Sequence, residues 1–189
     1  LMLFLAGAPL SWVLGLLGVG LAFMAFLSLR DDYSRQRILI MNDPGTDPYG
    51  EGYQLIQGYY AFASGGIFGV GLGNSRQKYS YLPMAYNDFI YAVTGEELGL
   101  VGAVAVLLAF FCLVWLGFRI ARNAPDLAGR LIAAGSMSML AMQMLVNVCG
   151  VLGIIPLSGK PVPFLSYGGS SIMSTLLLVG LALSVARYG

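Results

Sequence analysis

Three long stretches of this chain carry no charged side chain, and they restrict what it can fold into more than any other feature. They are Leu1–Leu29, Leu98–Phe118 and Leu131–Gly153. Each is long enough for a membrane-spanning helix, which needs about 20 largely apolar residues. A fourth apolar run, from about Ser171 to Ala186, is shorter and makes a full span only if it begins near Tyr167.

The composition agrees with a membrane protein. Only 10% of the residues are charged, compared with about 25% in soluble domains. We therefore predict an all-α polytopic membrane protein with about four transmembrane helices and one large loop. The predicted spans cover about 1–29, 88–118, 131–153 and 170–187, with loops at 30–87, 119–130 and 154–169. Because apolar sequence starts at Leu1 without a start methionine, we expect the C-terminal portion of a longer protein.

The short connection Arg119–Arg130 predicts the orientation in the membrane. It carries three arginines against one acid, Asp126. Short loops rich in Arg and Lys stay in the cytoplasm, so this loop is predicted to be cytoplasmic and the segments 30–87 and 154–169 extracytoplasmic. Basic residues are too few to follow a phosphate backbone, which argues against nucleic-acid binding.

The large loop contains a further uncharged run, Tyr53–Ser75, which is interrupted by glycines and by amide side chains such as Gln54. Such a stretch makes a poor lipid-facing helix. We predict short interfacial or re-entrant helices that cover a cavity.

Asp88 stands just before the second span. The chain has no histidine, so proton transfer falls to Asp, Glu, Lys or Tyr. Asp88 is either a general base that faces an extracytoplasmic cavity or an N-cap that accepts hydrogen bonds from free backbone N–H groups. The two roles are compatible. Leu98–Phe118 alone spans about 31 Å as a helix, and a continuous helix would place Asp88 roughly 15 Å further out, at or above the membrane surface.

Glu96 and Glu97 are adjacent acids, which point in different directions on a helix and do not form a glycosidase-type pair. A structural ion pair with a basic group elsewhere in the bundle is the favoured role. Lys160 is the only charge in the segment Ile155–Ser171, and it either binds an anionic substrate or pairs with one of these acids. Three prolines make this segment a rigid loop, predicted to end in an N-cap of Ser170 or Ser171.

A glycine-rich segment, Gly65–Asn74, is followed by Arg76 and Lys78. Glycine backbone with nearby cations is able to receive a phosphate or pyrophosphate. A plain turn is the commoner explanation of such glycines.

Taken together, these motifs resemble the SEDS (FtsW/RodA/SpoVE) family. The likeness runs through nearly the whole chain in order and spacing, on the residues Asp47-Pro48, Gly52-Tyr53-Gln54, Ser64-Gly65-Gly66, Gly69-Val70-Gly71-Leu72-Gly73, Tyr81-Leu82-Pro83, Asn87-Asp88-Phe89-Ile90, Gly95-Glu96-Glu97-Leu98-Gly99 and Pro163-Phe164-Leu165-Ser166-Tyr167-Gly168-Gly169-Ser170-Ser171. It corresponds to the last four of the family's ten membrane helices. The Asn-Asp-Phe and Gly-Lys-Pro forms lean toward FtsW or SpoVE.

The resemblance implies an inverting peptidoglycan glycosyltransferase that works on lipid II in the bacterial cytoplasmic membrane, with its active site on the extracytoplasmic side. The family's essential loop aspartate falls on Asp88, which would deprotonate the GlcNAc 4-hydroxyl of the acceptor. Candidate substrate-binding residues are Lys160, Arg76, Lys78, Glu96 and Gln54. No cofactor is certain, and the pyrophosphate leaving group allows a divalent cation (Mg or Mn). Expected partners are a class B penicillin-binding protein and other division or elongation membrane proteins.

One departure from the family pattern concerns Met84, which stands where the family usually has an acid after Tyr-Leu-Pro. A second carboxylate is therefore missing at that place. Two other functions stay open at this stage. They are translocation of lipid II across the membrane and a non-catalytic scaffold for a penicillin-binding protein.

Overall fold

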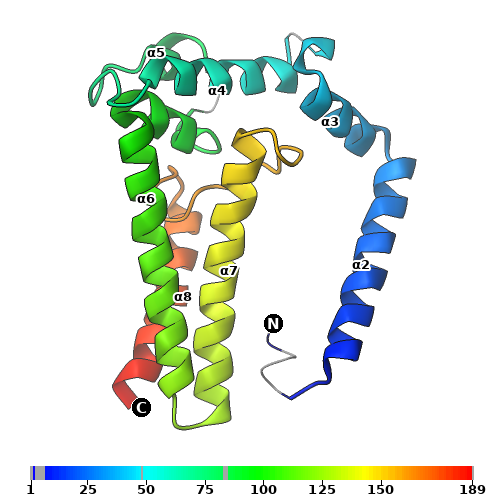
Figure 1. Ribbon diagram of the computed structural model, residues 1–189, viewed down its shortest axis with the longest axis vertical. Helices are drawn as coiled ribbons and strands as arrows, with labels where there is room; N and C mark the ends of the chain where they lie inside the picture. The colour runs from blue at the N-terminus through cyan, green and yellow to red at the C-terminus, as the bar shows by residue number, and fades with distance from the viewer. Residues whose placement is uncertain (1, 3–6, 48, 83–84, 189) are drawn as a thin grey trace.

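The computed structural model describes residues 2, 7–47, 49–82 and 85–188, and within these residues every regular element is a helix (Figure 1). The elements are α2 (Leu10–Arg30), α3 (Asp32–Asn42), the short 3-10 helix η1 (Pro44–Thr46), α4 (Glu51–Gly65), α5 (Arg76–Ser80), α6 (Ile90–Asn123), α7 (Leu127–Val151) and α8 (Gly169–Tyr188).

A three-helix bundle of α6, α7 and α8 forms the main body of the molecule. These helices are long and apolar enough to cross a membrane over Ile90–Asn123, Leu127–Val151 and Gly169–Arg187. The helix α7 packs against both α6 and α8, and buried methionine, alanine and leucine side chains fill the contacts between them. Large apolar side chains such as Phe111 and Leu177 are exposed on the outside, as expected for helices that face lipid. The predicted multi-pass membrane architecture is therefore confirmed for this part of the chain.

The predicted first span is only partly described. Its described part forms α2, a helix of 21 residues with an apolar section over Leu10–Phe26. The helix α2 stands apart from the bundle, and its main packing partner is α3 (Figure 1). Nearly all its described side chains are exposed, including Trp12 at 72%. The count of four spans therefore stays a prediction.

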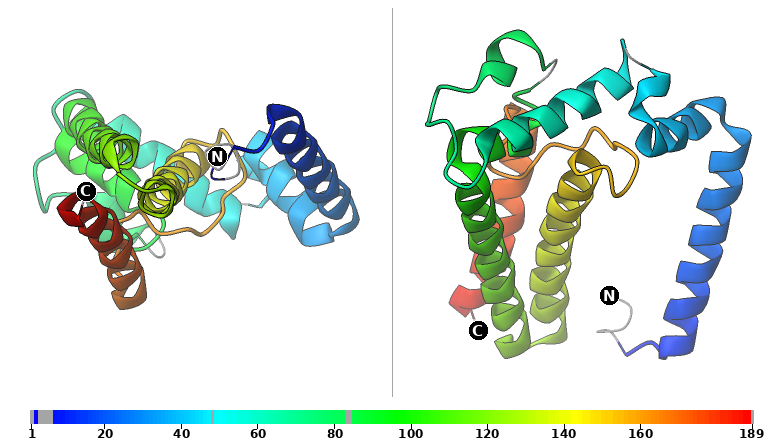
Figure 2. Two further views of the ribbon diagram at one scale, coloured as in Figure 1. Left: turned by 90° about the horizontal axis from the view of Figure 1, so that it is seen from below. Right: turned by 45° about the horizontal axis from the view of Figure 1, so that its top comes forward.

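The long loop between α2 and α6 folds into short helices. The helices α4 and α5 lie over one end of the bundle, and α3 lies between them and α2 (Figure 1 and the right-hand view of Figure 2). Its first helix, α3, is capped by Asp31, which accepts a hydrogen bond from the Ser34 amide at 3.2 Å. Arg37 on α3 donates to the Leu157 carbonyl at 2.6 Å and so ties this layer to the α7–α8 loop. The short helices that the sequence predicted in this loop are present.

The helix α6 is interrupted at Gly99, where the backbone turns to φ +69°. The chain after α4 fits into this break and replaces the missing helical hydrogen bonds. The Val70 amide donates to the Glu96 carbonyl at 3.0 Å, and the Leu100 amide donates to the Gly66 carbonyl at 2.9 Å. The continuous helix assumed for the depth of Asp88 is therefore wrong, because Gly99 adopts a backbone that ends the ladder.

The same contact explains most of the glycine-rich segment. A Cβ on Gly65 would overlap the Gly95 carbonyl, and one on Gly69 would overlap the Glu97 carbonyl. The Gly71 amide is also used, since it donates to the Glu97 carbonyl at 3.0 Å. The segment thus makes a close backbone contact with α6, and two of its amides, those of Val70 and Gly71, donate to α6 carbonyls.

We predict that Gly69→Ala destabilises the fold. Gly69 has φ +80° and no room for a methyl group, and a strained backbone of this kind costs about 1–3 kcal/mol before any clash is counted. The unfolding temperature of the detergent-solubilised protein should fall by several degrees. Gly180→Ala on α8, where a Cβ meets nothing within 4 Å, is the matched control and should not lower it. Equal unfolding temperatures for both variants would refute the account of this contact.

Candidate functional site

Asp88 lies in the turn directly before α6. The residue that caps α6 is Phe89, without a side-chain capping bond, so the capping role allowed for Asp88 is not observed. Its side chain is half-buried. Within the part of the chain that the structure describes, no group donates a hydrogen bond to the Asp88 carboxylate. Burial therefore raises the pKa of Asp88 above its ordinary value, because desolvation disfavours the charged form.

The backbone of this turn is held from outside. Three successive carbonyls, which precede the helix and have no role in its ladder, each accept a hydrogen bond from a residue far along the chain. The pairs are Tyr167 amide to Tyr86 at 2.8 Å, Ser166 Oγ to Asn87 at 2.5 Å, and Asn147 Nδ2 to Asp88 at 2.8 Å. The loop between α7 and α8 is thus bound directly to the turn that carries Asp88.

Asn147 joins the two halves of this arrangement. Its Nδ2 donates to the carbonyls of both Asp88 and Lys160, at 2.8 and 2.6 Å. The residue is 3% exposed, and its Oδ1 has no hydrogen-bond partner among the described residues. Leaving a buried acceptor unpaired costs about 1–3 kcal/mol. The sequence analysis missed Asn147, although an amide inside the apolar run Leu131–Gly153, which it shares with Gln143, was the signal that could have found it.

Lys160 follows Gly159 in the loop beside Asp88. A Cβ placed on Gly159 would lie 3.5 Å from Asp88 Oδ2, so the carboxylate rests over this glycine. Lys160 is exposed and lines a cavity of about 590 Å³ between α7 and α8. The polar side chains that share the cavity with it are Gln143, Ser170, Ser171 and Ser174. The helix α8 begins at Gly169, so the N-cap predicted at Ser170 or Ser171 is wrong, and both serines lie in its first turn.

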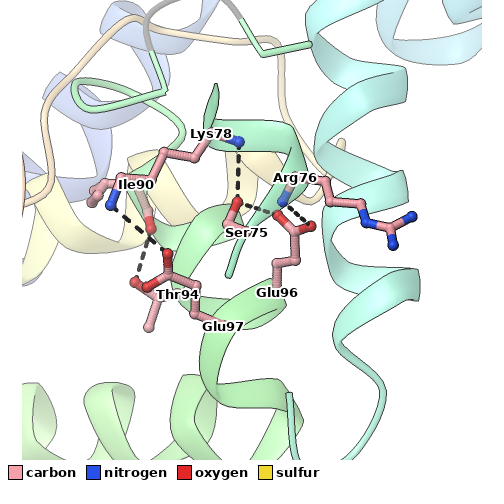
Figure 3. A network of polar contacts seen from close by, with 7 residues as sticks. All are labelled: Ser75, Arg76, Lys78, Ile90, Thr94, Glu96 and Glu97. Atoms are coloured by element: carbon pink, nitrogen blue, oxygen red, sulfur yellow. Dashed lines mark hydrogen bonds and ion pairs between the residues drawn. The ribbon is translucent and has the colours of Figure 1, made fainter. Parts of the chain in front are cut away.

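Glu96 is buried, at 2% exposure, in the first part of α6. Ser75 Oγ donates to one of its oxygens, and the Arg76 amide donates to the other at 3.0 Å (Figure 3). The Arg76 guanidinium points away from this carboxylate (Figure 3). Both oxygens of Glu96 are therefore used inside the chain, in keeping with the structural role that the sequence favoured. Its contact with substrate stays a prediction.

Glu97 pairs with Lys78, whose Nζ lies 3.8 Å from Glu97 Oε1. The same ammonium lies 5.9 Å from the centre of the Tyr86 ring, within the range of a cation–π contact. Lys78 thus links α5 to the turn that carries Asp88. The two acids of α6 therefore bind residues in or next to α5. Neither described acid pairs with Lys160, which lines the cavity between α7 and α8.

Two further sequence predictions concern the loop. Gln54 is half-buried on α4, and its side chain makes no hydrogen bond to the residues that the structure describes. Its contact with substrate stays a prediction. Met84, which departs from the family pattern, lies outside the described residues.

Comparisons with known proteins agree on one family. The model of the FtsW/RodA/SpoVE family, described as "Cell cycle protein", matches residues 1–189. Stage V sporulation protein E of Bacillus subtilis is 47% identical over 187 residues, which are 99% of this chain and 51% of that protein. A Geobacter metallireducens protein named "Probable peptidoglycan glycosyltransferase FtsW" is 45% identical over 186 residues, which are 98% of this chain and 50% of the relative.

Two solved structures are also similar. A structure of a peptidoglycan synthase complex, described as coordinating polymerization and crosslinking, matches with a TM-score of 0.69 and 33% identity over 97% of this chain and 50% of the other. The rod shape determining protein RodA of Thermus thermophilus, solved as an aspartate-to-alanine mutant, matches with a TM-score of 0.51 and 40% identity over 53% of this chain and 34% of the other.

The chain spans about half the length of the curated relatives that it matches. The match nevertheless covers this chain almost from end to end and includes the turn with Asp88 and the loop with Lys160. The chain therefore belongs to the FtsW/RodA/SpoVE family.

Proposed function

We propose that the protein is a peptidoglycan glycosyltransferase that transfers a lipid-linked glycan to the GlcNAc 4-hydroxyl of lipid II. The observation that carries this proposal is the Asp88 carboxylate, which is half-buried and receives no hydrogen bond from the described residues. A general base needs a free lone pair and a pKa that lies closer to the working pH than that of an exposed aspartate. The names of the relatives support the same chemistry.

In the proposed reaction, the Asp88 carboxylate accepts the proton of the acceptor 4-hydroxyl. The oxygen attacks the anomeric carbon of the donor, and a new C–O bond forms while the bond from that carbon to the pyrophosphate oxygen breaks. The leaving undecaprenyl pyrophosphate takes the electron pair, so the α-linked donor becomes a β-1,4 glycan. A single displacement of this kind inverts the anomeric carbon and needs one base.

Lys160 is proposed to bind the pyrophosphate of the lipid-linked donor. The cavity that it lines holds an ammonium and three serine hydroxyls, and the serines lie in the first turns of α8. A helix N-terminus favours anions through its free N–H groups and its dipole. Arg76, Lys78, Glu96 and Gln54 are proposed to act further from the reacting atoms, with Lys78 next to the Tyr86 ring.

A dedicated Mg or Mn site does not fit the side chains around Lys160. The polar groups of that cavity are an ammonium, hydroxyls and an amide, whereas these cations prefer carboxylate oxygens. Within the described ranges, no group of three or more His, Cys, Asp and Glu side chains lies together.

The proposal includes a location and a partner. The arginines near the α6–α7 connection favour a cytoplasmic position for that end, and we therefore propose that the end with Asp88 faces the outside, where lipid II is polymerised. The similarity to a chain in a peptidoglycan synthase complex supports assembly with a class B penicillin-binding protein, which would crosslink the new glycan.

We predict that Asp88→Asn, made in the full chain and assayed with labelled lipid II, lowers the polymerisation rate by roughly 10²–10⁴-fold, the usual contribution of a general base. Asp126→Asn is the matched control, because Asp126 caps α7 at the opposite end through the Gly129 amide and asparagine caps equally well. It should keep the parental rate. A normal glycan yield from the Asp88 variant would sink the proposal and favour a scaffold or a lipid II translocator.

We predict that Lys160→Gln raises the KM for the lipid-linked substrate by roughly tenfold or more. A charge-assisted hydrogen bond contributes about 1.5–3 kcal/mol, and about 1.4 kcal/mol corresponds to a factor of ten. Initial rates measured against lipid II concentration report the change. Arg122→Gln removes an exposed cation at the other end of the bundle and serves as the control. An unaltered KM together with a lower unfolding temperature would make Lys160 a structural residue instead.

A further inference from the structure

We propose that Asn147 is the positioning residue that fixes the Asp88 carboxylate relative to Lys160, an inference that rests on the proposed function. One nitrogen atom makes both links. Asn147 Nδ2 donates to the Asp88 carbonyl at 2.8 Å and to the Lys160 carbonyl at 2.6 Å. The proposed base and the proposed pyrophosphate ligand are thereby held to a single atom.

The residue type fits this task. The two bonded carbonyls belong to residues 59 and 13 positions away from Asn147 along the chain, and a primary amide offers two N–H donors on one atom. A serine or threonine hydroxyl has one donor, and an ionised aspartate has none. An amide is therefore the neutral side chain of this size that can bridge both carbonyls.

The place of Asn147 in the fold makes the link rigid. The residue is 3% exposed on α7, and its neighbours Met144 and Val148 belong to a buried apolar cluster with residues of α6. A site is held most accurately when its supporting residues stand on packed helices. Asn147 thus fixes the positions of Asp88 and Lys160 relative to the packed helices of the bundle.

The other bonds of this region do not make the same connection. Ser166 Oγ and the Tyr167 amide bind the turn before α6, but both belong to the α7–α8 loop and move with it. Gln143 on α7 donates to the Pro161 carbonyl at 2.9 Å, which holds that loop without contact to the turn. Among the described residues, Asn147 is the α7 side chain with a hydrogen bond to each of the two segments.

The unpaired Oδ1 of Asn147 also supports a positioning role. Buried polar atoms in folded proteins nearly always have partners, and each exception asks for an explanation. This oxygen is buried without a hydrogen bond among the described residues. A side chain that served stability alone would be better replaced by an apolar one of similar volume, whereas the double donor to Asp88 and Lys160 requires the amide.

The kinetic test uses Asn147→Leu, which keeps the approximate volume and removes both donors. We expect kcat for glycan polymerisation in the full chain to fall roughly 10- to 100-fold, the effect of a small misplacement of a reacting group. The KM should change less than kcat, because Lys160 keeps its charge and its loop is still held to α7 by the hydrogen bond from Gln143 to the Pro161 carbonyl. Asn147→Ser retains one donor and should give an intermediate kcat. This variant tests the inference even if the leucine variant fails to fold.

The control for the helix is Ser138→Ala, which removes a hydrogen bond from Ser138 Oγ to the Ala134 carbonyl within α7. It should retain the parental kcat. If Asn147→Leu lowers the unfolding temperature but keeps kcat, Asn147 is a structural residue and the inference is overturned.

A second readout does not depend on activity. A Cβ on Gly159 would lie 3.5 Å from Asp88 Oδ2, at a backbone φ of +61°. The pair Asp88→Cys and Gly159→Cys should therefore be close enough for an added oxidant to join them in a disulfide, in a background with Cys112→Ser and Cys149→Ser. Adding Asn147→Leu should slow that cross-link several-fold, whereas adding Ser138→Ala should not. Equal cross-linking rates would overturn the inference even if polymerisation is confirmed. Slower cross-linking with no polymerisation by the parent protein would uphold the positioning and reject the proposed function.

Discussion

The structure depends on how the turn before α6 is held, because this turn carries an acid that no described group pairs. Its three carbonyls cannot join the ladder of α6, which starts after them, and unpaired buried carbonyls would be costly. They are satisfied by the loop between α7 and α8 and by Asn147 on α7. The position of Asp88 is therefore set by the packing of α6 against α7, and the residues that hold it lie far from it in the sequence.

The interruption of α6 at Gly99 is likewise stabilised by hydrogen bonds from another segment of the chain. Gly99 interrupts the helix, and the backbone of the glycine-rich segment forms hydrogen bonds with the amide and carbonyl groups that the interruption leaves free. The first part of α6 is thus attached to α4 and α5 as well as to the bundle. Ser75 and Arg76 donate hydrogen bonds to Glu96, and Lys78 forms an ion pair with Glu97. No described group donates to the Asp88 carboxylate or forms an ion pair with it.

Much of this arrangement could be predicted from the sequence, and the rest had physical reasons to stay hidden. Uncharged runs indicated the three helices α6, α7 and α8, because hydrocarbon demands long apolar helices. Asp88 stood out as an acid beside such a run. The break at Gly99 did not, because a glycine inside an apolar run usually signals close packing, and only its φ reveals the left-handed turn. Asn147 was missed because its role comes from contacts with residues 88 and 160, which no local pattern links to it.

The dependence of the initial polymerisation rate on pH tests the central claim most directly. If Asp88 acts as the base, the rate must rise as its carboxyl loses a proton. Burial raises the pKa of Asp88, so the acidic limb should have its midpoint above the ordinary value of about 3.9. Replacing Asp88 with asparagine should abolish that limb. A rate that is flat through the acidic range, or the same limb in the asparagine variant, would contradict the assignment of Asp88 as the base.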